Sequence, residues 1–177
     1  MKNIISIIIL VLSISFSTNA QRTPVGSVNY NSNLDKFEGT WKWNNPNSNE
    51  EMILKLKKVM YYWDLPAGFY EEVLLSCHRY MKNGIVIEDN LSLFPTLGQN
   101  QTGDAILYES RTANDITGVF KDLLLNKNET LEITYNQANT PFLNWYLHKG
   151  SVPYKIGQTP PDISTTLPRD LILLKQP

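Results

Sequence analysis

Side chains able to do acid, base or nucleophilic chemistry are few in this 177-residue chain. Cys77 and His78 stand side by side, His148 is the second of two histidines, and acidic pairs occur at Glu71-Glu72 and Glu88-Asp89. Adjacent residues of a strand point to opposite faces, so the members of an acidic pair cannot form a two-carboxylate site with each other. We therefore expect no catalytic residues. A carboxylate supplied by another strand keeps an unrecognised hydrolase as a third hypothesis.

The nucleophile and the histidines fit structural roles better than chemical ones. The chain contains no G-x-S-x-G, Walker A, dinucleotide-binding, C-x-x-C or H-E-x-x-H motif. Cys77 alternates with Val73 and Leu75, so we expect it to be a small buried residue on the inward face of a strand. His78 is then expected to point outward and His148 to lie at a strand end. The sequence therefore predicts no shared metal site and no cofactor.

Charge and cysteine content exclude several classes of partner. The formal net charge is −1, with both signs interspersed, so nucleic acid and anionic membrane surfaces are not expected partners. Because Cys77 is the only cysteine, no intramolecular disulfide can form.

The first twenty residues have the pattern of a signal peptide. Lys2 precedes an apolar run from Ile4 to Phe16, and small residues end the segment at Ala20. We expect cleavage after Ala20, export to the periplasm or the cell exterior, and no stable membrane insertion afterwards.

Beyond the signal peptide, the chain divides into a leader and one domain. Residues 21–33 are polar and are expected to form a flexible leader, and residues 34–177 are expected to form a single domain.

The remaining chain reads as strands separated by turns. At Asn83-Gly84 a two-residue turn predicts a hairpin in which Lys82 faces Ile85 and Arg79 faces Glu88. Further runs with strand character and short polar connections predict an antiparallel meander that closes on itself. These runs are 37–43, 52–56, 59–64, 70–82, 85–88, 105–109, 116–121, 130–135, 142–148 and 171–175, with 90–97 as a segment that could pair further.

Two resemblances refine this reading. Gly39-Thr40-Trp41 resembles the G-x-W signature in the first strand of lipocalins and related calycins. That resemblance implies an all-β barrel of about 8 to 10 strands holding a small apolar ligand. Most of the mature chain, including 37–43, 116–122 and 167–176, is also similar to a family of small secreted bacterial proteins of unknown function.

Aromatic residues are the best candidates for a ligand site. Inward-facing aromatic rings in a barrel can line an apolar pocket, although the same rings can equally fill the core. The candidates for ligand contact are Trp41, Trp43, Tyr61, Trp63 and Trp145. The first hypothesis is therefore a small-molecule-binding barrel. The alternative is a non-catalytic structural or interaction module of the cell envelope, with a filled barrel that docks a protein partner.

Two local features carry further expectations. Trp41 is expected to lie across one closed end of the barrel against Leu171 and Leu173, where Gly39 lets the backbone approach closely. The proline-rich connection from Lys149 to Pro168 is longer than an ordinary hairpin loop, and it reads as a lid over the barrel mouth or a strap along a sheet edge.

Overall fold

The computed structural model describes residues 24–64, 68–148 and 164–177. The predicted signal peptide and most of the proline-rich connection lie outside the described residues. No helix in the described ranges is long and apolar enough to cross a membrane. The elements are β1 (Val28–Asn29), the 3-10 helix η1 (Ser32–Phe37), β2 (Gly39–Asn45), β3 (Glu50–Trp63), β4 (Phe69–Lys82), β5 (Ile85–Asp89), the 3-10 helix η2 (Leu91–Thr96), β6 (Ala105–Glu109), β7 (Asp115–Asp122), β8 (Lys127–Asn136), β9 (Phe142–Leu147) and β10 (Asp170–Lys175).

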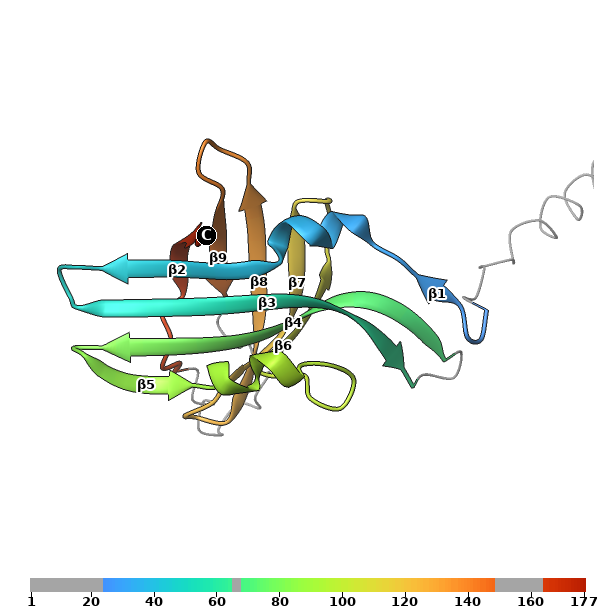
Figure 1. Ribbon diagram of the computed structural model, residues 1–177. Coiled ribbons are helices and arrows are strands. Elements are labelled where there is room, and N and C mark those ends of the chain that lie inside the picture. Colours follow the sequence, from blue (N-terminus) through green and yellow to red (C-terminus); the bar gives the residue numbers. More distant parts are fainter. Residues whose placement is uncertain (1–23, 65–67, 149–163) are drawn as a thin grey trace, which may run out of the picture.

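Within the described residues, eight strands form a closed antiparallel barrel, which confirms the predicted fold class. Each strand pairs with the next in the order β2, β3, β4, β6, β7, β8, β9 and β10, and β10 pairs back with β2. In Figure 1, β2 to β4 run across the direction of β7 to β9, so the barrel consists of two layers with crossed strands.

The long strand β4 shares one edge among three partners. Its centre pairs with β6 and closes the barrel, while its two ends pair with β1 and β5. Residues 28–29 of the predicted leader thus form a short parallel strand against β4. The Asn31 backbone N–H also donates to Glu72 at 2.6 Å, so this part of the leader is tied to the barrel.

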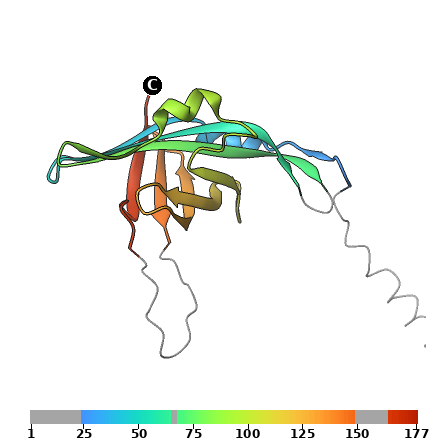
Figure 2. The same cartoon turned by 90° about the horizontal axis from the view of Figure 1, so that it is seen from below.

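The segment 90–97 forms η2 instead of pairing further as a strand. Pro95 has no N–H to give to a sheet ladder, and the Leu91 N–H is instead capped by the Asp89 side chain at 2.9 Å. Figure 2 shows η2 lying on the outer face of the layer that contains β3 and β4. The helix therefore covers a surface that a bare barrel would leave exposed.

Because of η2, β4 is buried on both faces. Inside the barrel, the main core is built around Trp41, Trp145, Phe37, Phe120, Leu74 and Leu107. Outside the barrel, a second cluster lies between β4 and η2 and comprises Val73, Leu75, Cys77 and Leu97, with partly buried aromatic and aliphatic neighbours.

The predicted orientation of His78 is wrong. His78 is fully buried and contacts Phe120 of the main core, with ring centroids 5.2 Å apart. Cys77 is also fully buried, as predicted, but it lies under η2 on the outer face of the barrel wall. Both faces of β4 bury apolar residues, so alternation alone did not identify the inner one.

The hairpin between β4 and β5 has the predicted turn but not the predicted register throughout. Lys82 faces Ile85, as expected, and Met81 faces Val86. A β-bulge then shifts the pairing by one residue, so Tyr80 faces Glu88 and Arg79 faces Asp89. The expected pairing of Arg79 with Glu88 is therefore wrong, because the extra residue turns Glu88 toward the barrel interior.

Trp41 is fully buried in the same core cluster as Leu171 and Leu173. The expected close approach of backbone at Gly39 is wrong, because the neighbour there is the Lys175 side chain, which a Cβ on Gly39 would meet at 3.5 Å.

The indole N–H of Trp41 donates to the Phe37 carbonyl at 2.8 Å, and its ring meets Tyr135 edge to face. The Lys175 ammonium lies 5.0 Å from the ring centroid. The indole therefore ties the helix before β2 to the strands that close the barrel.

Candidate functional site

The barrel interior contains a buried polar network centred on His78. Its Nδ1 contacts the Asp104 carboxyl group, and its Nε2 lies 3.0 Å from Oε2 of Glu88. Ser76 donates its hydroxyl hydrogen to the other oxygen of Asp104. Ser76 and His78 occupy alternate positions of β4, which places both side chains on the inner face.

Asp104 reaches this network because Gly103 lets two backbones approach. Gly103 bridges to Ser76, and a Cβ at this position would collide with the Ser76 carbonyl oxygen. Its φ of +71° is also a conformation that glycine adopts most readily. The Asp104 N–H then donates to the Ser76 carbonyl at 3.0 Å, which fixes the carboxyl group beside His78.

Glu88 links the network to the last strand. Its Oε2 accepts the Leu123 N–H at 3.0 Å, and its Oε1 accepts the Thr166 hydroxyl. Thr166 also contacts Asp122, whose carboxylate accepts the Thr166 N–H at 2.8 Å. These contacts anchor the chain just before β10 to the barrel interior.

The carboxyl partners determine the charge of His78. Burial by itself lowers the pKa of His78, but hydrogen bonds to Asp104 and Glu88 raise it to about 9. Burial raises the pKa of Glu88, whereas its hydrogen bonds to His78, Thr166 and the Leu123 N–H bring it well below its usual value. His78 is therefore a buried cation held between acidic groups at neutral pH.

This geometry suits a structural role. Both ring nitrogens of His78 are occupied by carboxyl groups, and Ser76 donates to Asp104 instead of to the imidazole. A serine nucleophile needs an imidazole that can accept its proton. His78 is also 0% exposed, so a substrate has no surface from which to reach it.

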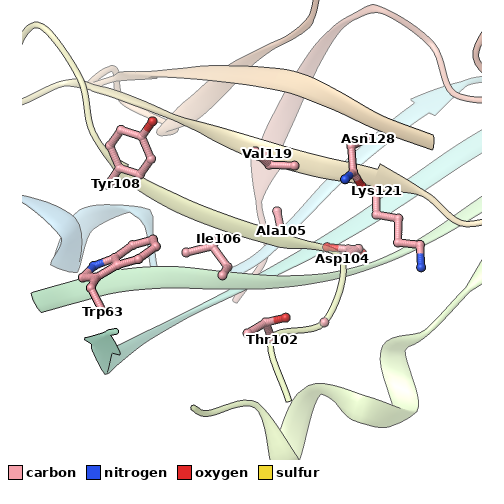
Figure 3. Close-up of a pocket in the computed structure, with 10 residues that line it drawn as sticks. Trp63, Thr102, Asp104, Ala105, Ile106, Tyr108, Val119, Lys121 and Asn128 are labelled. Carbon is pink, nitrogen blue, oxygen red and sulfur yellow. The ribbon is translucent and has the colours of Figure 1, made fainter. Parts of the chain in front are cut away.

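A hollow with a mainly apolar lining lies on the outside of the barrel. It is a groove of about 290 Å³ between the end of β3 and the outer faces of β6 and β7. Figure 3 shows Trp63 and Tyr108 at one end, Ile106, Ala105 and Val119 along the middle, and Lys121 and Asn128 at the other end. We call this hollow the Trp63 groove.

Strand register explains why these side chains meet. Ile106 and Tyr108 alternate along β6, and Val119 and Lys121 alternate along β7, so all four project outward. Ile106 faces Val119 across the two strands. Lys121 in turn faces Asn128 of β8. This surface could not be assembled from sequence without knowing that β6 pairs with β7 and approaches the end of β3.

Trp63 is held in place by its own contacts. Its indole N–H donates to Glu71 at 3.0 Å, and its ring meets Tyr61 edge to face at a centroid distance of 4.9 Å. Tyr61 itself packs against the cluster under η2. The wall of the groove is thus preorganised, because movement of Trp63 would break a hydrogen bond and an aromatic contact.

The other predicted ligand residues lie elsewhere. Trp41 and Trp145 are 0% and 1% exposed and belong to the main core. Trp43 packs partly against that core and lines a separate hollow, together with Trp145 and Asp170, where β2 no longer pairs with β10. The structure therefore brings together Tyr61 with Trp63, and Trp43 with Trp145, but it does not join the five candidates in one site.

The remaining reactive side chains do not converge with the groove or with each other. Burial raises the pKa of the Cys77 thiol to about 12, with a further contribution from Asp104, so the unreactive thiol form prevails at neutral pH. His148 pairs with Glu132 at 3.1 Å near the barrel surface, far along the chain from the His78 network. Among the described residues, no group of three or more His, Cys, Asp or Glu side chains is arranged to hold a metal ion.

Comparison with known proteins identifies a family but no activity. No curated protein and no solved structure matches the chain. A model of a family of unknown function (DUF6705) matches residues 1–176. This match spans nearly the whole chain, so the protein belongs to that family of unknown function, DUF6705.

Proposed function

We propose that this protein is an exported small-molecule-binding β-barrel protein, and that its ligand binds in the Trp63 groove. The observation that carries the proposal is a preorganised tryptophan, Trp63, facing an apolar groove on the barrel exterior. The ligand class is a small, largely apolar molecule.

The packing of the interior favours an external site. Four aromatic side chains are fully buried inside the barrel, namely those of Trp41, Trp145, Phe37 and Phe120. The rings of Phe120 and Trp145 meet edge to face, with centroids 5.0 Å apart. These rings fill the barrel interior, where the sequence resemblance would place a ligand. A filled barrel of eight strands is ordinary, since its interior is just wide enough for side chains.

The size and lining of the groove support binding of a small molecule. Its volume of about 290 Å³ is near the lower end of the range for small-molecule sites, roughly 300 to 1,000 Å³. Val119 and Tyr108 are 56% and 43% exposed, so apolar surface remains available there. Covering that surface would give a favourable hydrophobic contribution of about 25 cal/mol per Å².

A neutral apolar fluorescent probe, N-phenyl-1-naphthylamine, tests the proposal. We expect saturable binding at one site per protein, weakened at least about tenfold by Trp63→Ala, which removes an aromatic contact of the kind that dominates binding sites. Trp43→Ala is the matched control, because Trp43 is also a partly buried tryptophan beside a hollow but lies outside this groove. Absence of saturable binding, or equal affinity of the Trp63→Ala variant, would refute the proposed site.

The export part of the proposal depends on the sequence pattern of residues 1–20. An intact mass corresponding to Gln21–Pro177 in the envelope or extracellular fraction of the host is expected. A membrane-bound protein that retains Met1 would contradict it.

An interaction module remains the second candidate, favoured by a different surface. Tyr146, Ile172 and Leu174 are 43%, 57% and 47% exposed on the outer faces of β9 and β10. Neighbouring exposed apolar side chains of this kind are common at protein interfaces. Crosslinking in the cell envelope tests this candidate. It is favoured if Ile172→Lys abolishes a crosslink to an envelope protein while the binding of N-phenyl-1-naphthylamine is unchanged.

A further inference from the structure

The Trp63 groove differs chemically between its two ends. Trp63 and Tyr108 offer aromatic surface at one end, whereas Lys121 and Asn128 offer an ammonium and an amide at the other (Figure 3). Ile106 and Val119, which face each other across β6 and β7, form an apolar floor between them. A ligand that matches this lining has an apolar body and one polar end.

Lys121 forms no ion pair with a carboxylate in the described part of the chain. Among the described residues, no carboxylate lies within 4.0 Å of its Nζ, whereas Lys42, Lys58 and Lys82 all form ion pairs. Lys121 is also exposed at the edge of the groove. Its ammonium group is therefore available to an anionic ligand.

The one acidic residue that lines the groove is turned away from it. The side chain of Asp104 is 0% exposed, and both of its carboxyl oxygens are engaged inside the barrel by Ser76 and His78. The groove thus presents no free carboxylate to repel an anion. Among the described residues that line the groove, Lys121 is the cation, so the polar end has a net positive character.

The donors present suit a carboxylate better than a phosphate group. Lys121 and Asn128 face each other across β7 and β8, so an ammonium and a side-chain amide can approach one small anion from neighbouring strands. A single positive charge balances a monoanion, whereas a phosphate monoester carries about −1.5 to −2 at neutral pH. Hydrogen bonds between charged partners are also stronger than those between neutral ones.

We propose that the Trp63 groove binds small amphipathic carboxylic acids, with the carboxylate at Lys121 and Asn128 and the apolar or aryl part between Trp63 and Tyr108. This inference rests on the proposed function and specifies its ligand class. It predicts that, of two ligands with the same shape, the one with a carboxylate at its polar end binds more tightly than the one with a neutral group there.

The test compares 4-phenylbutyrate with its neutral isostere 4-phenylbutanamide as competitors of the bound N-phenyl-1-naphthylamine at low ionic strength. We expect the acid to bind about tenfold more tightly than the amide, because the amide cannot form the charge-assisted contact. Lys121→Met should reduce the affinity for the acid to that for the amide and leave the affinity for the amide unchanged.

Lys82→Met is the matched control for net charge. Lys82 is an exposed lysine that pairs with Glu50 at the far end of β4, so its removal changes the total charge equally but leaves the groove intact. We expect no change in the affinity for the acid. An equal loss in both variants would show that general electrostatic attraction, and not the groove, selects the acid.

The failures of the two proposals are distinguishable. Equal binding of acid and amide, with both weakened by Trp63→Ala, would overturn the carboxylate inference and leave the proposed groove function standing. Failure of the probe and both competitors to bind, or binding that is insensitive to Trp63→Ala, would overturn both.

Discussion

At the scale of single residues, His78 is the most informative position in the molecule. It is a buried cation that contacts Asp104 and Glu88, and its backbone N–H is capped by Asn90 at 2.7 Å. A charged group without solvent persists in a core only when it is paired and hydrogen-bonded. The conformation of three separate segments, around Ser76, Asp104 and Glu88, therefore depends on one imidazole.

The first prediction concerns the stability of His78→Gln. Removing the cation leaves two acidic groups buried without their partner, and losses from breaking such pairs are about 3 to 5 kcal/mol. The control is His148→Gln, because His148 and Glu132 are both more than one third exposed and surface pairs contribute about 0 to 1 kcal/mol. Urea denaturation measures both variants, and equal small losses would contradict a network centred on His78.

The second prediction is the pH dependence of the same network. The pKa of His78 rises from 6.5 to about 9 on folding, so its contribution is complete below pH 6.5 and is lost as the pH rises through about 9. The stability difference between wild type and His78→Gln should therefore shrink over that interval. Denaturation curves at about pH 6 and about pH 10 measure it, and a difference independent of pH would mean that His78 is neutral in the folded protein.

At the scale of elements, β4 is distinguished by burial on both faces. One face contributes Leu74, Ser76 and His78 to the barrel interior, and the other contributes Leu75 and Cys77 to the cluster under η2. Strands of an ordinary barrel expose their outer faces to water. In this barrel the 3-10 helix η2 covers the outer face of β4 in place of water. Because both faces are buried, apolar residues follow one another almost continuously at the centre of β4.

The third prediction tests which element covers Cys77. Thiol labelling in the native protein should be slow, because Cys77 is fully buried and its pKa is raised to about 12. Phe94→Ala should accelerate it, since Phe94 of η2 packs on the cluster that contains Cys77. Tyr108→Ala, which truncates an exposed ring on β6, should leave the rate unchanged.

Two results would contradict that assignment. Rapid labelling of the wild-type protein without denaturant would show that η2 does not protect the thiol. A rate insensitive to Phe94→Ala would place Cys77 inside the barrel, on the face that the sequence pattern first suggested.

At the scale of the whole molecule, closure of the barrel depends on contacts between the beginning and the end of the chain. Trp41 of β2 pairs with Lys175 of β10, whose ammonium lies over the indole. Tyr135 of β8 and the Phe37 carbonyl complete its surroundings. Trp41 therefore joins segments that are nearly as far apart in sequence as the described chain allows.

The fourth prediction compares Trp41 with Trp63. Trp41→Ala should destabilise the protein by about 3 to 5 kcal/mol, because it leaves a large cavity where the barrel closes. Trp63→Ala should cost less, because Trp63 is only partly buried on the outside of the wall. Thermal melts of both variants give the order, and equal small losses would remove the closing role from Trp41.

Local patterns in the sequence were sufficient for much of the architecture. The turn at Asn83-Gly84 and the closing strand around Leu171 to Lys175 are present as predicted. The opening strand predicted over 37–43 is present as β2, but it begins at Gly39, because Phe37 is the last residue of η1. Alternation and turn chemistry act over a few residues, so they can be read without knowledge of distant contacts. Of the five aromatic residues predicted to contact a ligand, Trp63 lines the groove proposed here, and its contact with a ligand stays a prediction.

The decisive features of the two sites depended on contacts between distant segments. The β-bulge that turns Glu88 inward, the approach of Gly103 to Ser76 and the helix over Cys77 all arise where segments far apart in sequence pack together. The alignment of Lys121 with Tyr108 in one groove likewise follows from the pairing of β6 with β7. Sequence alone determined that the chain forms strands that close into a barrel. Tertiary structure decided which face of β4 points inward, that aromatic rings pack in the barrel interior, and where an apolar groove remains open, because each of these depends on what the rest of the chain places against a strand.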